Sequence, residues 1–302
     1  MKIKNLFLFG AGASYGCNGT NEVVPLGISL FMNLKKKFPQ TWGILPTDFE
    51  NDFNKNFEKG MSRLWCDLSY NDKISFFMKD FAIYFSEFKI IDFGQNLYYR
   101  LFNELKRRNI LKETVFSTIN YDCLIELAIE KLNLSYDYFI ENINNKAIVL
   151  KLHGSCNFIL DSKFISVRSG AKYRPGITFN PPLSFISPID IEKYCHSDTA
   201  LYPAMAIYMN DKPIQMGYVT IKKIQENWQD IIMRAEKIFI IGVNPNLEDK
   251  HIWDYIDKKD QIFYCGSRDN FDDWQQNRIR EDIFLNCTFE SAIQDIIKLS
   301  LR

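Results

Sequence analysis

The sequence lacks net charge and long apolar runs. Its 302 residues include 37 Lys and Arg against 37 Asp and Glu, which gives a formal charge of zero at pH 7. Because affinity for a phosphate backbone comes from clustered Lys and Arg, this balance argues against a dedicated DNA- or RNA-binding protein. No apolar run approaches the roughly 18 residues that a membrane-spanning helix needs. We therefore expect no direct contact with nucleic acid and no membrane association.

Paired cysteines and histidines are also scarce. The seven cysteines include no C-x-x-C pair, and the chain has only three histidines. This excludes the commonest zinc-ribbon and redox motifs, and the one close His/Cys pair, His153 and Cys156, is not expected to bind a metal. An odd, scattered set of cysteines is typical of reduced thiols. We therefore expect a cytoplasmic, metal-free protein.

What the sequence does contain is a pattern of short buried strands. Six apolar runs end at Gly, Asn or a polar loop, and each precedes a helical pattern or a loop that leads to one. Strands that alternate with helices form a parallel sheet with crossover helices. The pattern predicts a single α/β domain over 1–302, a Rossmann-like doubly wound parallel sheet of about six strands. The runs are Lys4 to Phe9, Thr114 to Thr118, Ala147 to Leu152, Lys237 to Ile241, Gln261 to Cys265 and Phe284 to Thr288.

Two segments interrupt this pattern. Residues 26–110 read as an inserted helical subdomain, whose first helix has Pro25 at its first position. Its aromatic stretch 76–102 suits a subdomain core or a surface for self-association, with Phe81 and Tyr84 as the residues that would test the second interpretation. Residues 161–199 look irregular and predict either a solvated loop or a flap that meets an anionic ligand. The basic side chains of that flap are Arg168, Lys172 and Arg174.

The first candidate site is the glycine-rich turn that follows the first strand. Gly10, Ala11, Gly12 and Ser14 lie where backbone N–H groups and a helix N-terminus can bind a phosphate. The dinucleotide fingerprint G-x-G-x-x-G is incomplete, because Tyr15 replaces its third glycine. The same residues suit a tight structural turn, and Gly12-x-Ser14-x-Gly16 also matches the nucleophile elbow of serine hydrolases.

Three further sites follow later strands. Thr118, Asn120 and Asp122 stand at the carboxyl end of the second strand, where open parallel sheets bind ligands. Asp122 also suits a helix cap, and Asn120 suits a turn. His153 closes the third run and can transfer protons near neutral pH, although a lone histidine is often structural. The last site is a polar turn suited to ribose hydroxyls or to a helix cap, and it contains Gly242, Asn244 and Asp249.

Taken in this order, the blocks Gly-Ala-Gly-Ala-Ser, Thr-x-Asn-Tyr-Asp, Leu-His-Gly-Ser and Ile-Ile-Gly-Val-Asn resemble the signature blocks of the sirtuin family. The resemblance implies a Rossmann-type sheet with NAD across the carboxyl ends of its strands. It implies a pyrophosphate at Gly10, Ala11, Gly12 and Ser14, nicotinamide near Thr118, Asn120 and Asp122, ribose at His153, and adenosine near Gly242, Asn244 and Asp249.

The absent C-x-x-C pairs set this chain apart from sirtuin deacylases, which carry a small zinc module with two such pairs. The sequence is similar to the bacterial branch without that module, the NAD hydrolases of antiphage defence. This resemblance implies an NAD glycohydrolase with Asn120 and His153 as catalytic residues and NAD as the substrate. A homo-oligomer or a partner defence protein would control it. The alternatives are a protein deacylase or ADP-ribosyltransferase, and a non-catalytic sensor or scaffold that binds NAD or ADP-ribose.

Overall fold

A seven-stranded parallel sheet forms the centre of the molecule. The computed structural model describes residues 3–142, 146–172, 176–209, 212–246, 249–276, 278 and 280–302. The strand order is β3-β4-β2-β1-β7-β8-β9, and every neighbouring pair is parallel. The strands are β1 (Ile3–Phe9), β2 (Thr114–Thr118), β3 (Tyr136–Asp137), β4 (Ala147–Lys151), β7 (Ala235–Ile241), β8 (Ile262–Cys265) and β9 (Ile283–Asn286).

The six predicted runs are confirmed as strands, with bounds that agree to within two residues. They are almost continuously apolar because helices cover both faces of the sheet. The additional strand, β3, has only two residues and pairs with β4 at one edge, so it carries no hydrophobic period that a sequence pattern could reveal. The doubly wound parallel architecture is therefore as expected, with one more strand.

Adjacent side chains of β2 show how the two helical layers are attached. The Phe116 ring packs against Phe102 of α6, while the Ser117 hydroxyl accepts a hydrogen bond of 3.0 Å from Trp228 of α9, on the opposite face. Helices α6 (Leu97–Arg107), α7 (Leu124–Lys131) and α12 (Phe289–Leu301) lie on the first face, and α9 (Tyr218–Arg234) and α10 (Lys250–Ile256) on the second.

Helix α11 (Arg268–Gln275) packs beside α10 through its Trp274 ring, which contacts Trp253. Gln276 is the C-cap, and Arg278 turns back to pair with Asp257 and Asp282. Together, the sheet and helices α6, α7 and α9 to α12 are called the sheet lobe below.

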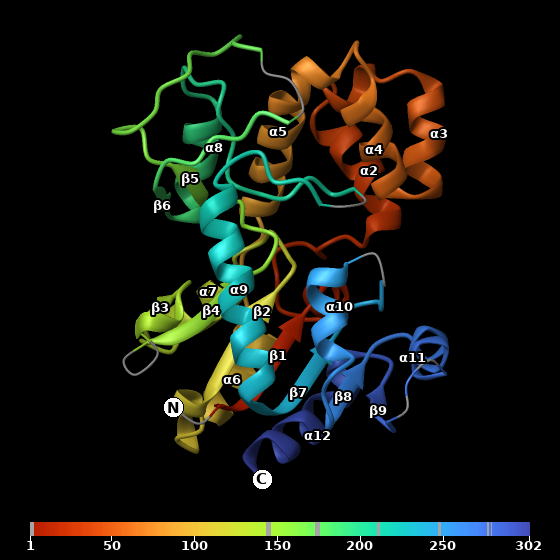
Figure 1. Cartoon of the computed structure of the whole chain (residues 1–302), viewed down its shortest axis with the longest axis vertical. Coiled ribbons are helices and arrows are strands. Elements are labelled where there is room, and N and C mark those ends of the chain that lie inside the picture. Colours follow the sequence, from red (N-terminus) through yellow and green to blue (C-terminus); the bar gives the residue numbers. More distant parts are fainter. Residues whose placement is uncertain are drawn as a thin grey trace.

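A second, helical lobe sits above the carboxyl ends of the strands (Figure 1). Its helices are α2 (Gly27–Lys37), α3 (Thr47–Lys55), α4 (Phe57–Cys66), α5 (Ile74–Ser86) and α8 (Ile191–Cys195), with the antiparallel pair β5 (Phe158–Leu160) and β6 (Leu183–Phe185). Short 3-10 turns stand at Trp42–Ile44, Asn71–Lys73, Leu111–Glu113, Ile140–Asn142 and Pro188–Asp190. Helix α2 begins at Gly27 with Leu26 as its N-cap, so Pro25 lies before the helix rather than at its first position.

Aromatic side chains of the insertion form the core of the helical lobe. Trp42 contacts both Phe57 and Phe77, and Phe81 packs on Phe57, all of them buried. Phe81 and Tyr84 are buried. The interpretation of these two residues as part of a self-association surface is therefore wrong, because their rings already stabilise the lobe.

The segment 161–199 is more regular than the sequence indicated, because it contains β6, the turn Pro188–Asp190 and α8. Lys172 is paired with Asp72 of the helical lobe at 2.5 Å, and Arg168 is exposed. Arg174 lies outside the described residues. Of the three basic side chains of the predicted flap, Lys172 is thus engaged by a carboxylate of the protein itself.

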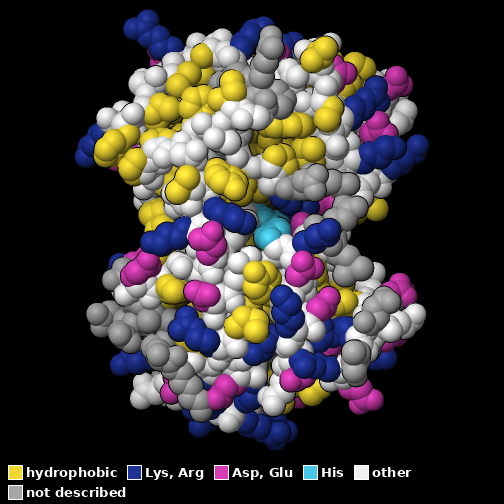
Figure 2. Space-filling view, viewed as in Figure 1, with side chains coloured by type: hydrophobic (Ala, Val, Ile, Leu, Met, Phe, Trp, Pro, Cys, Tyr) yellow, Lys and Arg dark blue, Asp and Glu magenta, His cyan; other side chains and the backbone are white. Residues whose placement is uncertain are grey.

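The surface carries charges of both signs in a mixed pattern over the sheet lobe, while apolar side chains are more frequent over the helical lobe (Figure 2). This distribution agrees with the zero net charge. Within the described ranges, no helix has both the length and the apolar character that crossing a bilayer requires. The seven cysteines are all free thiols.

We expect Phe81→Ala to lower the free energy of unfolding by about 3 to 5 kcal/mol, because it removes a buried ring and leaves a cavity. Phe76 lies on the same helix and is 44% exposed, so Phe76→Ala serves as the matched control and should cost less than about 1 kcal/mol. Urea denaturation measures both. Equal losses would contradict the assignment of Phe81 to the core.

Candidate functional site

Two glycine loops meet at the point where the strand order reverses. From β1 the chain proceeds to β2 on one side, whereas β7, β8 and β9 extend to the other side. The Gly12 N–H donates to the Gly242 carbonyl at 2.9 Å, and the Gly10 N–H donates to the Ile241 carbonyl at the same distance. Such a switch point, at the carboxyl ends of parallel strands, is where open sheets bind ligands. We call this side of the sheet the carboxyl edge.

The close approach of the two loops explains why both carry glycine. A Cβ at Gly10 would lie 2.5 Å from the Gly242 oxygen, and a Cβ at Gly242 would lie 2.1 Å from the Ala13 nitrogen. Gly242 also has φ of +65°, which side chains disfavour. The predicted contact of this turn with a pyrophosphate stays a prediction. The Gly12 amide is engaged within the chain, and Ala11 lies exposed at the rim.

Ser14 is the centre of a buried hydrogen-bond network. Its side chain is 1% exposed, and its hydroxyl donates to Asp122 Oδ2 at 3.0 Å. It accepts a hydrogen bond from Asn120 Nδ2 at 2.9 Å and lies 3.0 Å from the hydroxyl of Tyr98. A serine nucleophile is exposed and needs an imidazole at its hydroxyl. The described contacts of Ser14 include no imidazole, so the nucleophile-elbow interpretation does not fit this geometry.

The Asn120 side chain is held in one orientation. Its amide nitrogen donates to the Gly10 carbonyl at 2.8 Å as well as to Ser14. Because a carbonyl oxygen only accepts, the amide nitrogen must face Gly10, and both of its hydrogens are used. The remaining polar atom is Oδ1, which is a hydrogen-bond acceptor. Asn120 is half-buried at the carboxyl edge, so this oxygen is suited to accept a hydrogen bond from water or a ligand hydroxyl.

The two neighbours of Asn120 in its motif support it from below. Thr118 donates to the Phe9 carbonyl at 3.0 Å and accepts from the Asn120 backbone N–H. Asp122 accepts from the N–H of Leu124, the first residue of α7, at 3.1 Å. Both side chains are almost fully buried. The N-cap of α7 is Cys123, so the predicted helix cap at Asp122 is wrong by one residue, although Asp122 still accepts from the first helical N–H. Direct contact of Thr118 or Asp122 with nicotinamide stays a prediction.

A buried ion pair lies behind this network. Lys151 Nζ is 3.2 Å from Glu126 Oε1, both side chains are almost inaccessible, and Lys151 also donates to the Asp122 carbonyl. Burial raises the pKa of Glu126, and Lys151 opposes that rise. Lys151 lies inside the third apolar run, Ala147 to Leu152, where the sequence pattern indicated no role for it. The sequence could not predict its pairing with Glu126, because the two residues are 25 positions apart and meet only when α7 packs on β4.

His153 is 3% exposed, and its Nε2 lies 3.2 Å from Nε2 of His251 on α10. Burial, His251 and Lys212 together lower the pKa of His153 well below its ordinary value. Burial, Lys222 and Lys212 lower the pKa of His251 from 6.5 to about 4. Histidine atoms are visible at the narrow waist between the two lobes (Figure 2). We call His153 and His251 the imidazole pair. Sequence reasoning did not select His251, since it lies inside a helical pattern.

Lys212 bridges the two lobes beside the imidazole pair. Its amine is 2.5 Å from Glu58 of α4 in the helical lobe and 3.5 Å from Asp249, the N-cap of α10. Asp249 is therefore a capping and ion-pairing residue, and its contact with adenosine stays a prediction. Asn244 is exposed in the same turn and makes the rim of the carboxyl edge together with Ala11. Among the described side chains, no three His, Cys, Asp or Glu gather into a metal site.

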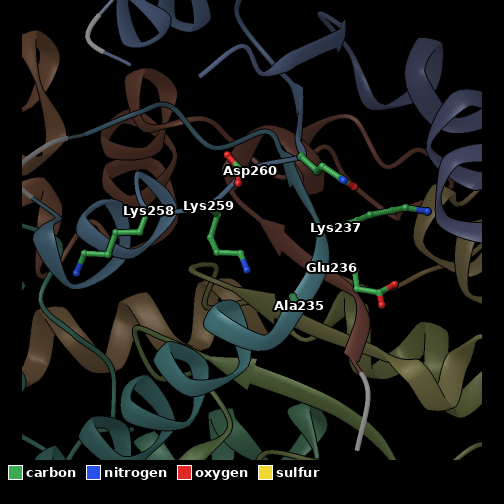
Figure 3. A pocket seen from close by; sticks show the side chains of 7 residues that line it. Ala235, Glu236, Lys237, Lys258, Lys259 and Asp260 are labelled. Carbon is green, nitrogen blue, oxygen red and sulfur yellow. The ribbon is translucent and has the colours of Figure 1, made fainter. Parts of the chain in front are cut away.

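An open hollow of about 400 Å³ lies elsewhere (Figure 3). Its lining includes Ala235, at the start of β7, and Gln261, just before β8, so it opens at the amino ends of the strands. Two of its lysines are already engaged, since Lys237 donates to the Leu299 carbonyl and Lys259 to the Met233 carbonyl. None of the candidate residues lies there. The carboxyl edge is therefore the better candidate site.

Comparisons with known proteins give structural similarity without a sequence match. No protein-family model matches the chain, and no curated protein does. A structure described as the structural basis of sirtuin substrate affinity is 13% identical, with a TM-score of 0.47 over 99% of this chain and 93% of the other. A Sir2 structure with a deacetylated p53 peptide and 3'-O-acetyl ADP-ribose is 14% identical, with a TM-score of 0.45 over 99% and 92%. At this level the similarity does not define a family.

The imidazole pair makes stability depend on pH. The unfolded chain takes up a proton at His251 near pH 6.5, but the folded chain takes it up only near pH 4. Stability is therefore complete above pH 6.5 and falls as the pH drops toward 4. Between pH 7 and 5, His251 should account for about 1 to 2 kcal/mol of the loss. Thermal melts of the wild type and His251→Gln measure this share, and identical pH dependence in both would refute it.

We expect Gly242→Ala to destabilise the protein by about 2 to 5 kcal/mol, since it adds a clash with the Ala13 amide to the strain of a positive φ. Gly170 also has a positive φ, with open space around its missing Cβ. Gly170→Ala therefore isolates the backbone strain and should cost about 1 kcal/mol. Urea denaturation of both variants measures the difference. If both variants lose the same free energy of unfolding, the close contact between the loops does not contribute to stability as predicted.

Proposed function

We propose that this protein is an NAD glycohydrolase, which cleaves the nicotinamide–ribose bond of NAD to give nicotinamide and ADP-ribose. The observation that carries the proposal is the Asn120 carboxamide. Its nitrogen is fully used within the protein, which leaves Oδ1 as an oriented acceptor at the carboxyl edge. An acceptor held in this way is suited to orient a water molecule or a ribose hydroxyl for reaction.

His153 follows the neighbouring strand β4 and lies at the same level as Asn120. In the sheet register, Thr118 of β2 pairs with Lys151 of β4, and Asn120 and His153 each follow two residues later. The carboxyl ends of adjacent parallel strands bring these two residues to one edge. The lowered pKa of His153 keeps its imidazole neutral near pH 7, so the ring can accept a proton.

The reaction then balances with residues of this chain alone. The bond between ribose C1' and the nicotinamide nitrogen breaks, and its electron pair leaves with nicotinamide. The oxygen of a water molecule forms the new bond to C1', and the proton of that water passes to the His153 ring. The ribose carries positive charge during this step, and fixed dipoles such as Asn120 Oδ1 can stabilise it.

Hydrolysis is preferred over deacylation because the chain lacks the two C-x-x-C pairs of sirtuin deacylases. The resemblance of the four motifs to the antiphage branch supports a role in defence through NAD depletion. It also supports control by further copies of this chain or by a partner defence protein. An acyl-lysine or ADP-ribose acceptor as the true second substrate is the competing hypothesis.

The direct test is to incubate the purified chain with NAD and to follow nicotinamide and ADP-ribose by chromatography. We expect Asn120→Ala and His153→Ala each to lower turnover by about 10² to 10⁴, the usual contribution of positioned acid–base groups. His196 is an exposed histidine at the C-cap of α8, away from the carboxyl edge. His196→Ala is thus the matched control and should retain full activity.

Three results would overturn parts of this proposal. Full activity in both site variants would show that the wrong residues are assigned. Nicotinamide release only after addition of an acylated or acceptor substrate would favour deacylation or transfer. Calorimetric binding of NAD without any product, also with candidate partners present, would favour a sensor or scaffold. Circular dichroism of each variant verifies that it is folded.

A further inference from the structure

The imidazole pair joins two segments that are far apart in sequence. His153 follows β4 and its carbonyl accepts from the Ala206 N–H at 2.8 Å, whereas His251 is the second residue of α10. The buried Ile252 and Trp253 anchor α10 directly after His251. The ring centroids are 5.3 Å apart and the ring planes are inclined by 46°. Both rings are thus placed by the fold rather than by a flexible loop.

A hydrogen bond between two Nε2 atoms at 3.2 Å fixes the number of protons between the rings. One Nε2 must carry hydrogen and the other must present a lone pair, since two hydrogens or two lone pairs would repel each other. When His153 is the donor, its Nδ1 is left with a lone pair and can accept a proton from a substrate. The same bond then offers the His153 Nε2 hydrogen an acceptor on His251.

We propose that His251 is a positioning residue that holds His153 in this tautomer and carries the abstracted proton from the buried ring toward solvent. The inference rests on the proposed function. In the step, His153 Nδ1 gains a proton from water or a ribose hydroxyl, and the N–H bond at His153 Nε2 breaks while one forms at His251 Nε2. His251 then loses its Nδ1 proton to solvent, which leaves both rings neutral with their tautomers exchanged. Exchange of the ring protons with solvent after product release restores the starting tautomers.

Burial and charge favour this direction of transfer. His153 is almost inaccessible, whereas His251 is partly exposed at the waist. The groups that act on the pair are cationic, with Lys212 near both rings and Lys222 of α9 near His251. Glu58 and Asp249 are paired with Lys212. A positively charged ring is therefore disfavoured in either position, so a proton taken up by the pair is released rather than stored.

The pair itself is tested without NAD by imidazole ¹⁵N NMR of the full chain as a function of pH. Resonances are assigned with the single variants His153→Asn, His196→Asn and His251→Asn. We expect the His153 and His251 rings to respond to protonation at the same pH, as one unit. In His251→Asn, the pKa of His153 should move up toward its ordinary value. An unchanged His153 titration in that variant would overturn the proposal.

The relay is tested by NAD turnover in two variants. Asparagine can keep a hydrogen bond to His153 but cannot carry a proton, so His251→Asn should lower kcat at least tenfold with little change in KM. Free imidazole should restore part of the rate of His251→Ala. Lys250 is exposed on the same helix turn, and Lys250→Ala is the matched control with unchanged kcat.

The outcomes separate the two proposals. If the wild type turns over NAD and His251→Asn matches its kcat across the pH range, the relay is wrong while the NAD glycohydrolase stands. If the wild type gives no product from NAD, also with candidate partners present, the proposed function fails. The NMR titration then still upholds or overturns the coupling of the two rings.

Discussion

The contact between the Gly10 turn and the Gly242 loop is the constraint on which the candidate site depends. It fixes the two loops of the switch point against each other at backbone distance, which only glycine allows. The Gly10 carbonyl, placed by this contact, in turn accepts from Asn120 and sets the orientation of its amide. Ser14 and Asp122 complete the same network. The geometry of the proposed reaction is therefore a direct consequence of how β1 and β7 end.

Electrostatics at the site follow from burial more than from net charge. The chain is neutral overall, and two basic side chains near the site are paired with carboxylates, Lys151 with Glu126 and Lys212 with Glu58. Desolvation then lowers the pKa of both imidazoles. Both imidazoles of the pair are therefore neutral near pH 7.

The sequence was sufficient to predict the sheet because buried parallel strands are continuous apolar runs with polar ends. The sequence was also sufficient to predict that Asn120 and His153 lie at the carboxyl edge, because polar residues directly after such strands must lie there. It could not reveal His251 or Lys212, since their roles arise from the way α10 and the segment before α9 fold back over the edge. The role of the aromatic insertion was ambiguous because cores and protein interfaces are both rich in aromatic residues, so the sequence around Phe81 fits either.

The amide nitrogen and the backbone N–H of Asn120 make their hydrogen bonds within the chain, which fixes the direction of the side chain and leaves Oδ1 as the acceptor. The entropy of ordering this side chain is therefore lost when the protein folds, and it is not lost again in each cycle of the proposed reaction. Such a site has a low reorganisation energy, so substrate encounter rather than rearrangement of Asn120 would limit its first step. In the proposed reaction Asn120 is in position before the substrate arrives, so control by a partner or by further copies of this chain would act on access to the carboxyl edge.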